Sequence, residues 1–185
     1  MAVRPWTLLD EARVPGSGER IRLSQRGDEF AIRLGNYNQL MNSRVHASEV
    51  ALSELGCAHL RGRRDARVLI GGLGMGFTLR ATLDVLPREA DATVVIAELV
   101  SGVVEWNRGP LGALSGSPLT DPRVVVEIGD VAATLTTSRN RFDAIMLDVD
   151  NGPDAFTTAR NGFLYGDHGL AAAYGALHDD GVLAV

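Results

Sequence analysis

Three acidic residues, Glu98, Asp130 and Asp148, are the first candidates for chemistry in this sequence. Each lies at or just past the end of a short run rich in Val, Ile or Leu, and each run is bounded by turn residues. Apolar runs of this length predict buried β-strands. Because the carboxyl ends of parallel strands meet at one edge of a sheet, we expect these three carboxylates to lie close together.

The three carboxylates suit different contacts. Glu98 ends the strand that follows a glycine-rich loop, where a carboxylate can accept hydrogen bonds from both hydroxyls of a ribose. Asp130 lies where an adenine amino group would arrive, and its alternative role is to cap the helix that begins at Val131. Asp148 is the candidate catalytic group, with Asp150 two residues later as a second acid.

The glycine-rich loop connects a strand to a helix. Residues 68–80 read VLIGGLGMGFTLR. Glycines permit a sharp turn and a close approach to a ligand, and the helix that follows directs its free N–H groups toward it. The pattern matches neither the dinucleotide fingerprint G-x-G-x-x-G nor a Walker motif. It is typical of transferases that bind S-adenosylmethionine or a relative, although glycines at a turn can also serve packing alone. The expected nucleoside contacts are Gly72, Gly74, Met75, Gly76, Glu98, Leu99, Asp130 and Val131.

The elements that must position these residues alternate between strand and helix. From residue 61 the pattern predicts an α/β fold, an S-adenosylmethionine-methyltransferase-like (Rossmann-like) parallel sheet with helices on both faces. Residues 19–60 are expected to form a small β-meander and a helix capped by Asn42 or Ser43. Residues 1–18, with little periodicity, are expected to form a loose N-terminal arm. The nucleoside-binding α/β domain then spans residues 61–185.

Composition narrows the class of partner. The chain has 185 residues, 45% of them hydrophobic, and a net charge of -5, so it lacks the basic surface that nucleic acid or an anionic membrane attracts. A single cysteine, Cys57, excludes an internal disulfide, and the histidines show no zinc-site spacing. The sequence contains neither a membrane-spanning apolar run nor a signal-peptide pattern. We expect a cytoplasmic protein that binds small molecules and no metal.

These motifs together resemble the spermidine synthase (polyamine aminopropyltransferase) family. Residues 72–80 are similar to the family's GGGDGGTLRE, and residues 142–148 to its YDVIIxDxxDP. Gln39 falls where family members have a glutamine that contacts the donor. The resemblance implies that Gln39, the glycine loop, Glu98 and Asp130 bind the nucleoside, and that Asp148 serves an incoming amine.

The reaction that the resemblance implies is transfer of an aminopropyl group from decarboxylated S-adenosylmethionine to a small-molecule amine. The amine attacks a carbon beside the sulfonium, a neutral thioether leaves, and a carboxylate at Asp148 accepts the proton. Two alternatives remain open. One is an S-adenosylmethionine-dependent methyltransferase on the same fold, and the other is a nucleoside-binding regulator without turnover.

Departures from the family pattern affect the expected specificity. Met75 stands where the family's loop has aspartate, Ser48 where an acceptor-side tyrosine is usual, and Asn151 where a second loop aspartate falls. Since a thioether is only a weak acceptor for an ammonium, we expect a weakened preference for the decarboxylated donor unless Asp148 or Asp150 replaces the missing acid. The sequence stops at Val185, before the strand pair that covers the fifth strand in the family, so an open edge and a homodimer are expected.

Overall fold

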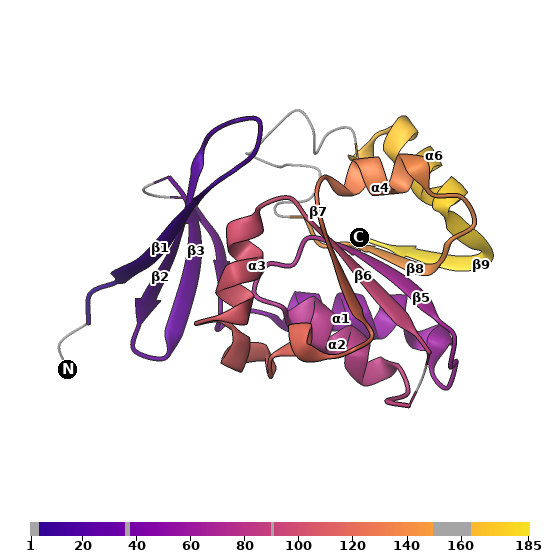
Figure 1. The fold of residues 1–185 in the computed structure, drawn as a ribbon, viewed down its shortest axis with the longest axis horizontal. Coiled ribbons are helices and arrows are strands. Elements are labelled where there is room, and N and C mark those ends of the chain that lie inside the picture. Colours follow the sequence, from indigo (N-terminus) through magenta and orange to yellow (C-terminus); the bar gives the residue numbers. More distant parts are fainter. Residues whose placement is uncertain (1–3, 36–37, 90, 150–163) are drawn as a thin grey trace.

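The computed structural model describes residues 4–35, 38–89, 91–149 and 164–185, and these residues form two sheets (Figure 1). The first is antiparallel, with the strand order β1-β2-β3-β4, and the second has the order β7-β6-β5-β8-β9. The strands of the first sheet are β1 (Thr7–Arg13), β2 (Arg20–Arg26), β3 (Glu29–Leu34) and β4 (Asn38–Asn42). The expected β-meander is therefore present.

The meander begins earlier than the sequence indicates. β1 pairs antiparallel with β2, from Thr7 opposite Gln25 to Arg13 opposite Arg20. The prediction of a loose arm is thus wrong for residues 7–13. Most side chains of this edge strand are exposed, so they lack the apolar alternation from which a strand is recognised, and backbone pairing with β2 stabilises it instead.

Helix α1 (Ala47–Gly56) follows the meander, and the predicted caps are wrong. Its N-cap residue is His46, which makes no side-chain capping hydrogen bond. The Asn42 side chain accepts a hydrogen bond from a backbone N–H two residues later, and the Ser43 hydroxyl accepts one from a backbone N–H of β3. Both side chains are therefore used in the turn that leaves β4, before the helix begins.

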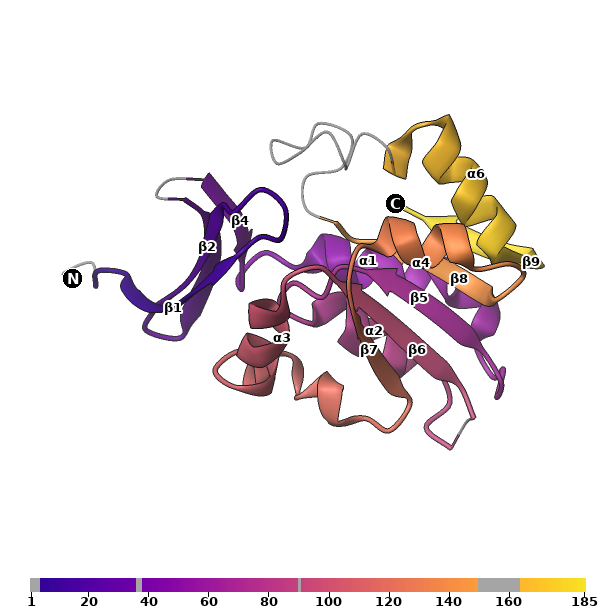
Figure 2. The same ribbon diagram turned by 45° about the horizontal axis from the view of Figure 1, so that its top comes forward.

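The second sheet is parallel throughout, as predicted. Side chains alternate between its faces, so that Val68 and Ile70 of β5 pack in one apolar cluster and Leu69 in another. Helices α1, α2 and α3 contribute to the first cluster, and α4 and α6 cover the other face (Figures 1 and 2). The elements are β5 (Arg67–Gly71), α2 (Phe77–Val85), β6 (Thr93–Glu98), α3 (Ser101–Arg108), β7 (Val124–Ile128), α4 (Val131–Thr137), β8 (Phe142–Leu147), α6 (Asp167–Ala176) and β9 (Leu177–Ala184), with short 3-10 helices at Ala58–Leu60, Gly112–Ser115 and Pro118–Thr120.

The strand order reverses beside β5. The chain passes from β5 outward to β6 and β7 and then returns to β8 on the other side of β5. At this switch point the Gly72 N–H donates to the Ala97 carbonyl at 2.9 Å, and the Asp148 N–H donates to the Gly71 carbonyl at 2.9 Å. The start of the glycine loop is thereby tied to both neighbouring strands, in the place where doubly wound sheets bind ligands.

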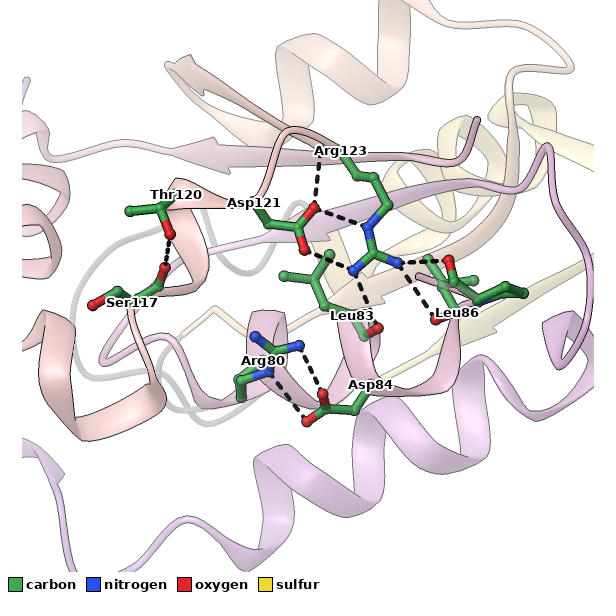
Figure 3. A network of polar contacts seen from close by, with 9 residues as sticks. Arg80, Leu83, Asp84, Leu86, Ser117, Thr120, Asp121 and Arg123 are labelled. Atoms are coloured by element: carbon green, nitrogen blue, oxygen red, sulfur yellow. Dashed lines mark hydrogen bonds and ion pairs between the residues drawn. The ribbon is translucent and has the colours of Figure 1, made fainter. Parts of the chain in front are cut away.

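A buried arginine anchors the far end of α2 (Figure 3). The Arg123 guanidinium pairs with the Asp121 carboxylate at 2.7 Å and donates to the backbone carbonyls of Leu83 and Leu86, both at 3.4 Å. Carbonyls in the last turn of a helix have no partner within the helix, so Arg123 supplies one. The ion pair lowers the pKa of Asp121. The helix behind the glycine loop is thus fixed to the chain that enters β7.

Strand β9 lies at one edge of the parallel sheet and β7 at the other. The predicted homodimer through the β9 edge stays a prediction.

In the part of the chain that the structure describes, the helices are too short or too polar to cross a membrane.

Candidate active site

A cavity of about 390 Å³ lies between the meander and the carboxyl ends of β5, β6, β7 and β8. Its wall combines residues from the glycine loop, from the ends of the parallel strands and from the meander. Most of the residues predicted from the sequence line this one cavity: Gly72, Gly74, Glu98, Leu99, Asp130, Val131 and Asp148. The structure therefore brings together the three acids that follow separate strands.

Three of the predicted ligand contacts, Gln39, Met75 and Gly76, do not line the cavity. Asp150 lies outside the described residues. Gln39 is exposed on β4, opposite Arg33, and does not line the cavity. Gly76 precedes α2 with a φ of 82°. Met75 is 2% exposed, and its side chain packs in the core. The Met75 side chain therefore does not line the cavity.

Glu98 connects the glycine loop to the end of β6. One carboxylate oxygen accepts the Leu73 N–H at 2.8 Å, and the other accepts the Val100 N–H at 2.7 Å. Only 7% of the residue is exposed. Burial raises the pKa of Glu98, and the backbone hydrogen bonds oppose that rise. Each carboxylate oxygen can accept more than one hydrogen bond, so Glu98 retains acceptor capacity for the hydroxyls of a ligand.

Asp130 caps α4. Its Oδ1 accepts the Ala132 N–H at 2.9 Å, so the capping role that the sequence offered as an alternative is confirmed. Asp130 also lines the cavity together with Val131. A contact with the base of a nucleoside stays a prediction.

Asp148 is a partly buried carboxylate at the end of β8. It accepts a hydrogen bond from the hydroxyl of Thr78, which is 1% exposed in the first turn of α2. Burial raises the pKa of Asp148 to about 6; the Thr78 hydrogen bond opposes the rise, and the negative charge of Glu49 on α1 adds to it. A carboxyl group with this pKa is suited to hold a cation and to accept a proton near neutral pH.

Gly72 is required by the close approach of the glycine loop to β8. Its φ is 90°, which favours glycine, and a Cβ at this position would lie 2.5 Å from the carbonyl oxygen of Asp148. The first glycine of the motif therefore allows the loop to pass directly against the strand that carries the candidate catalytic acid.

Sequence reasoning missed several parts of the site. Thr78 lies within the glycine-loop motif and could have been recognised as a hydroxyl in the first helical turn after the loop. Glu49 had no local signal, because its influence on Asp148 depends on the packing of α1. The β1–β2 turn, residues 14–19, gives the cavity Val14, Pro15, Gly16, Ser17 and Glu19, and the rest of the meander adds Ile21, Ile32, Leu34, Leu40 and Met41.

In the described ranges, no group of three or more His, Cys, Asp or Glu side chains could hold a metal ion.

Comparison with known proteins identifies the family. The family model of the spermine/spermidine synthase domain matches residues 52–185. The chain belongs to this family. Residues 52–185 include the glycine loop and the three strand-end acids, so the resemblance inferred from these motifs is confirmed.

Solved structures show the same fold. The crystal structure of spermidine synthase from Thermotoga maritima aligns with 95% of this chain at a TM-score of 0.71 and 22% identity. That of a probable spermidine synthase from Corynebacterium glutamicum ATCC 13032 aligns with 96% at a TM-score of 0.63 and 15% identity. The chain covers 54% and 62% of the lengths of these two proteins. The comparison with curated proteins gives no match.

Proposed function

We propose that this member of the spermine/spermidine synthase family transfers an aminopropyl group from decarboxylated S-adenosylmethionine to a small-molecule amine. The observation that carries the proposal is the position of Asp148. This carboxylate, with its pKa raised by burial, lines the same cavity as Glu98 at the switch point of the sheet. A site that binds a nucleoside sulfonium beside a proton acceptor has the parts that the transfer needs.

The donor contacts follow from the chemistry of the cavity wall. Glu98 accepts hydrogen bonds from the ribose hydroxyls, because a carboxylate offers two oxygens at the right separation. The backbone at Gly72 and Gly74 passes close to the sulfonium end, where side chains would obstruct the donor. Leu99, Asp130 and Val131 contact the adenine.

The transfer itself requires alignment and one proton acceptor. The amine nitrogen attacks the methylene carbon next to the sulfonium, the carbon–sulfur bond breaks, and its electron pair stays on sulfur as a neutral thioether. The product amine loses a proton to Asp148. Holding both substrates in line supplies much of the rate enhancement, and a base contributes on the order of 10²- to 10⁴-fold.

One observation favours a second candidate, methyl transfer from intact S-adenosylmethionine. The loop position occupied by acid in the family holds Met75, whose side chain lies in the core, so it offers no partner for the bare ammonium of the decarboxylated donor. The intact donor carries its own carboxylate beside the ammonium.

Product analysis separates these functions. The protein is incubated with each donor and a panel of mono-, di- and polyamines, and the products are identified by mass spectrometry. Aminopropyl transfer yields 5′-methylthioadenosine and an amine extended by three carbons and a nitrogen, and methyl transfer yields S-adenosylhomocysteine. We expect 5′-methylthioadenosine and the extended amine from the original protein. We expect neither product from Asp148→Asn. Tight nucleoside binding without either product over the whole panel would refute the proposal and indicate a regulator.

A further inference from the structure

Strand β1 and helix α3 approach each other more closely than two side chains allow. A Cβ added at Gly102 of α3 would lie 2.5 Å from the Cβ of Ala12 in β1 and 3.8 Å from its Cα. The first distance is shorter than real contacts between such atoms, and the second is ordinary van der Waals contact. Glycine is unfavourable inside a helix compared with alanine. Its presence at position 102 is accounted for by the strand that packs on it.

A hydrogen bond holds the same two elements together. The Trp106 indole N–H donates to the Asp10 carboxylate at 2.8 Å. Trp106 is 2% exposed, and a buried indole N–H needs a partner. Gly102 and Trp106 are four residues apart and therefore lie on one face of α3. This face is the one against which β1 packs.

The strand held in this way leads directly into the wall of the cavity. β1 ends at Arg13, and residues 14–19 form the turn that lines the cavity on the side of the meander that faces the α/β domain (Figure 2). Backbone hydrogen bonds close the turn, from the Val14 N–H to the Glu19 carbonyl at 2.8 Å and from the Gly18 N–H to the Val14 carbonyl at 3.0 Å. The turn is therefore closed by its own backbone hydrogen bonds and continues directly from β1.

Helix α3 also belongs to the other wall of the cavity. It begins three residues after Glu98, and its residue Val103 lines the cavity beside Leu99. The Asn107 side chain at its C-terminal end donates to the Gly74 carbonyl at 2.8 Å and so holds the glycine loop. One short helix thus contacts β1, which leads into the turn, and the glycine loop, and it begins just after the strand end that carries Glu98.

We propose that the contact between Gly102 and Ala12 positions the β1–β2 turn as a wall of the nucleoside-binding site and thereby sets the affinity for the adenine nucleoside. Gly102 is a positioning residue, since it acts through the turn and does not line the cavity itself. The inference rests on the proposed function, because it takes the ligand of the cavity to be an adenine nucleoside.

The test adds a methyl group at position 102 and then removes the opposing methyl group at position 12. Gly102→Ala places a second Cβ between α3 and β1, and we expect the dissociation constant for 5′-methylthioadenosine to rise at least about fivefold, roughly 1 kcal/mol. The double variant Ala12→Gly with Gly102→Ala leaves only the 3.8 Å contact with the Cα of residue 12. Its affinity is expected to return to within about twofold of the original value, below 0.5 kcal/mol.

A matched control comes from α6. A Cβ at Gly175 would meet nothing closer than 4.0 Å, so Gly175→Ala makes the same exchange in a helix without displacing a neighbour. We expect its nucleoside affinity to be unchanged. Affinities are measured by calorimetry on variants whose urea unfolding confirms that they are folded. Turnover at saturating donor and the KM for the amine should stay unchanged in Gly102→Ala, which a general loss of structure would not allow.

The outcomes are distinct. Normal affinity in Gly102→Ala, or a folded double variant that does not regain affinity, overturns the inference. If Gly102→Ala does not fold, Asp10→Ala tests the inference instead, because it removes the hydrogen-bond partner of Trp106 at an exposed position. This variant should weaken nucleoside binding about threefold, as expected for the loss of one hydrogen bond. An original protein that binds no adenine nucleoside contradicts the proposed function instead.

Discussion

Replacing Asp148 by asparagine should increase stability and decrease activity at the same time. Asparagine has nearly the same shape and can still accept the hydrogen bond from Thr78 through its carbonyl oxygen. What it removes is the negative charge, which burial disfavours in the folded protein. The variant therefore separates the role of the charge from that of packing.

The magnitude follows from the pKa of Asp148, which burial raises from 3.8 to about 6. Between these two values the folded protein holds a proton that the unfolded chain has released, so the free energy of unfolding falls as pH rises through this window. A difference of about two pH units corresponds to roughly 3 kcal/mol at 1.36 kcal/mol per unit. At pH 8 the whole effect is present, and near pH 4 most of it is absent.

Urea unfolding of both proteins at pH 4, 5, 6 and 8 measures this difference. The gain in unfolding free energy of Asp148→Asn should be about 2 kcal/mol larger at pH 8 than at pH 4. Turnover at pH 8 should fall by about 10² or more, with nucleoside affinity kept within a few fold.

Two results would refute the reasoning. A stability difference that does not change between pH 4 and pH 8 would mean that the Asp148 carboxylate is not held in an unfavourable environment. Equal loss of nucleoside affinity and turnover would make Asp148 a binding residue and leave the transfer without its proton acceptor.

Three further substitutions test the site. Glu98→Gln should weaken nucleoside binding at least about tenfold, because hydrogen bonds to a charged group contribute roughly 1.5 to 3 kcal/mol, and calorimetry with unchanged affinity would remove Glu98 from the site. Gly72→Ala should destabilise the fold by at least about 1 kcal/mol in urea unfolding, because a Cβ at this position would lie 2.5 Å from the Asp148 carbonyl oxygen and the backbone conformation favours glycine. A fully stable variant would show that the loop can move away from β8. Met75→Asp should lower the midpoint of thermal unfolding, because it buries an unpaired carboxylate in the core, and it should not strengthen the preference for the decarboxylated donor. A stable variant with a stronger preference for that donor would place position 75 at the ligand.

The parallel sheet and the acids at its edge were predictable because their signals are local. The apolar runs of β5, β6 and β8 reflect strands buried on both faces, and a run that ends in an acid places that acid at the carboxyl end of a strand. Glu98 and Asp148 could therefore be assigned to one edge of the sheet before their distance in space was known. The glycine loop was equally readable, since its turn depends on the residues that form it.

Other properties of the same residues required the tertiary structure. The buried position of Met75 and the exposed position of Gln39 depend on which face of an element meets the core, and a resemblance in motif does not specify that. The raised pKa of Asp148 arises from its burial and from the negative charge of Glu49, and the Thr78 hydrogen bond opposes the rise. Its value depends on folding of the whole domain.

The sequence by itself determined the alternation of strands and helices from residue 61 onward, the glycine turn and the acids at the strand ends, because each follows from periodicity or spacing within a few residues. Only the tertiary structure decided that β1 is a strand and that the turn after it lines the cavity. That strand is recognised by its backbone pairing with β2 and by its contact with Gly102 and Trp106, not by its own exposed side chains. Contacts between segments so far apart in the chain leave no local pattern, since each partner taken alone is an ordinary alanine, glycine, aspartate or tryptophan.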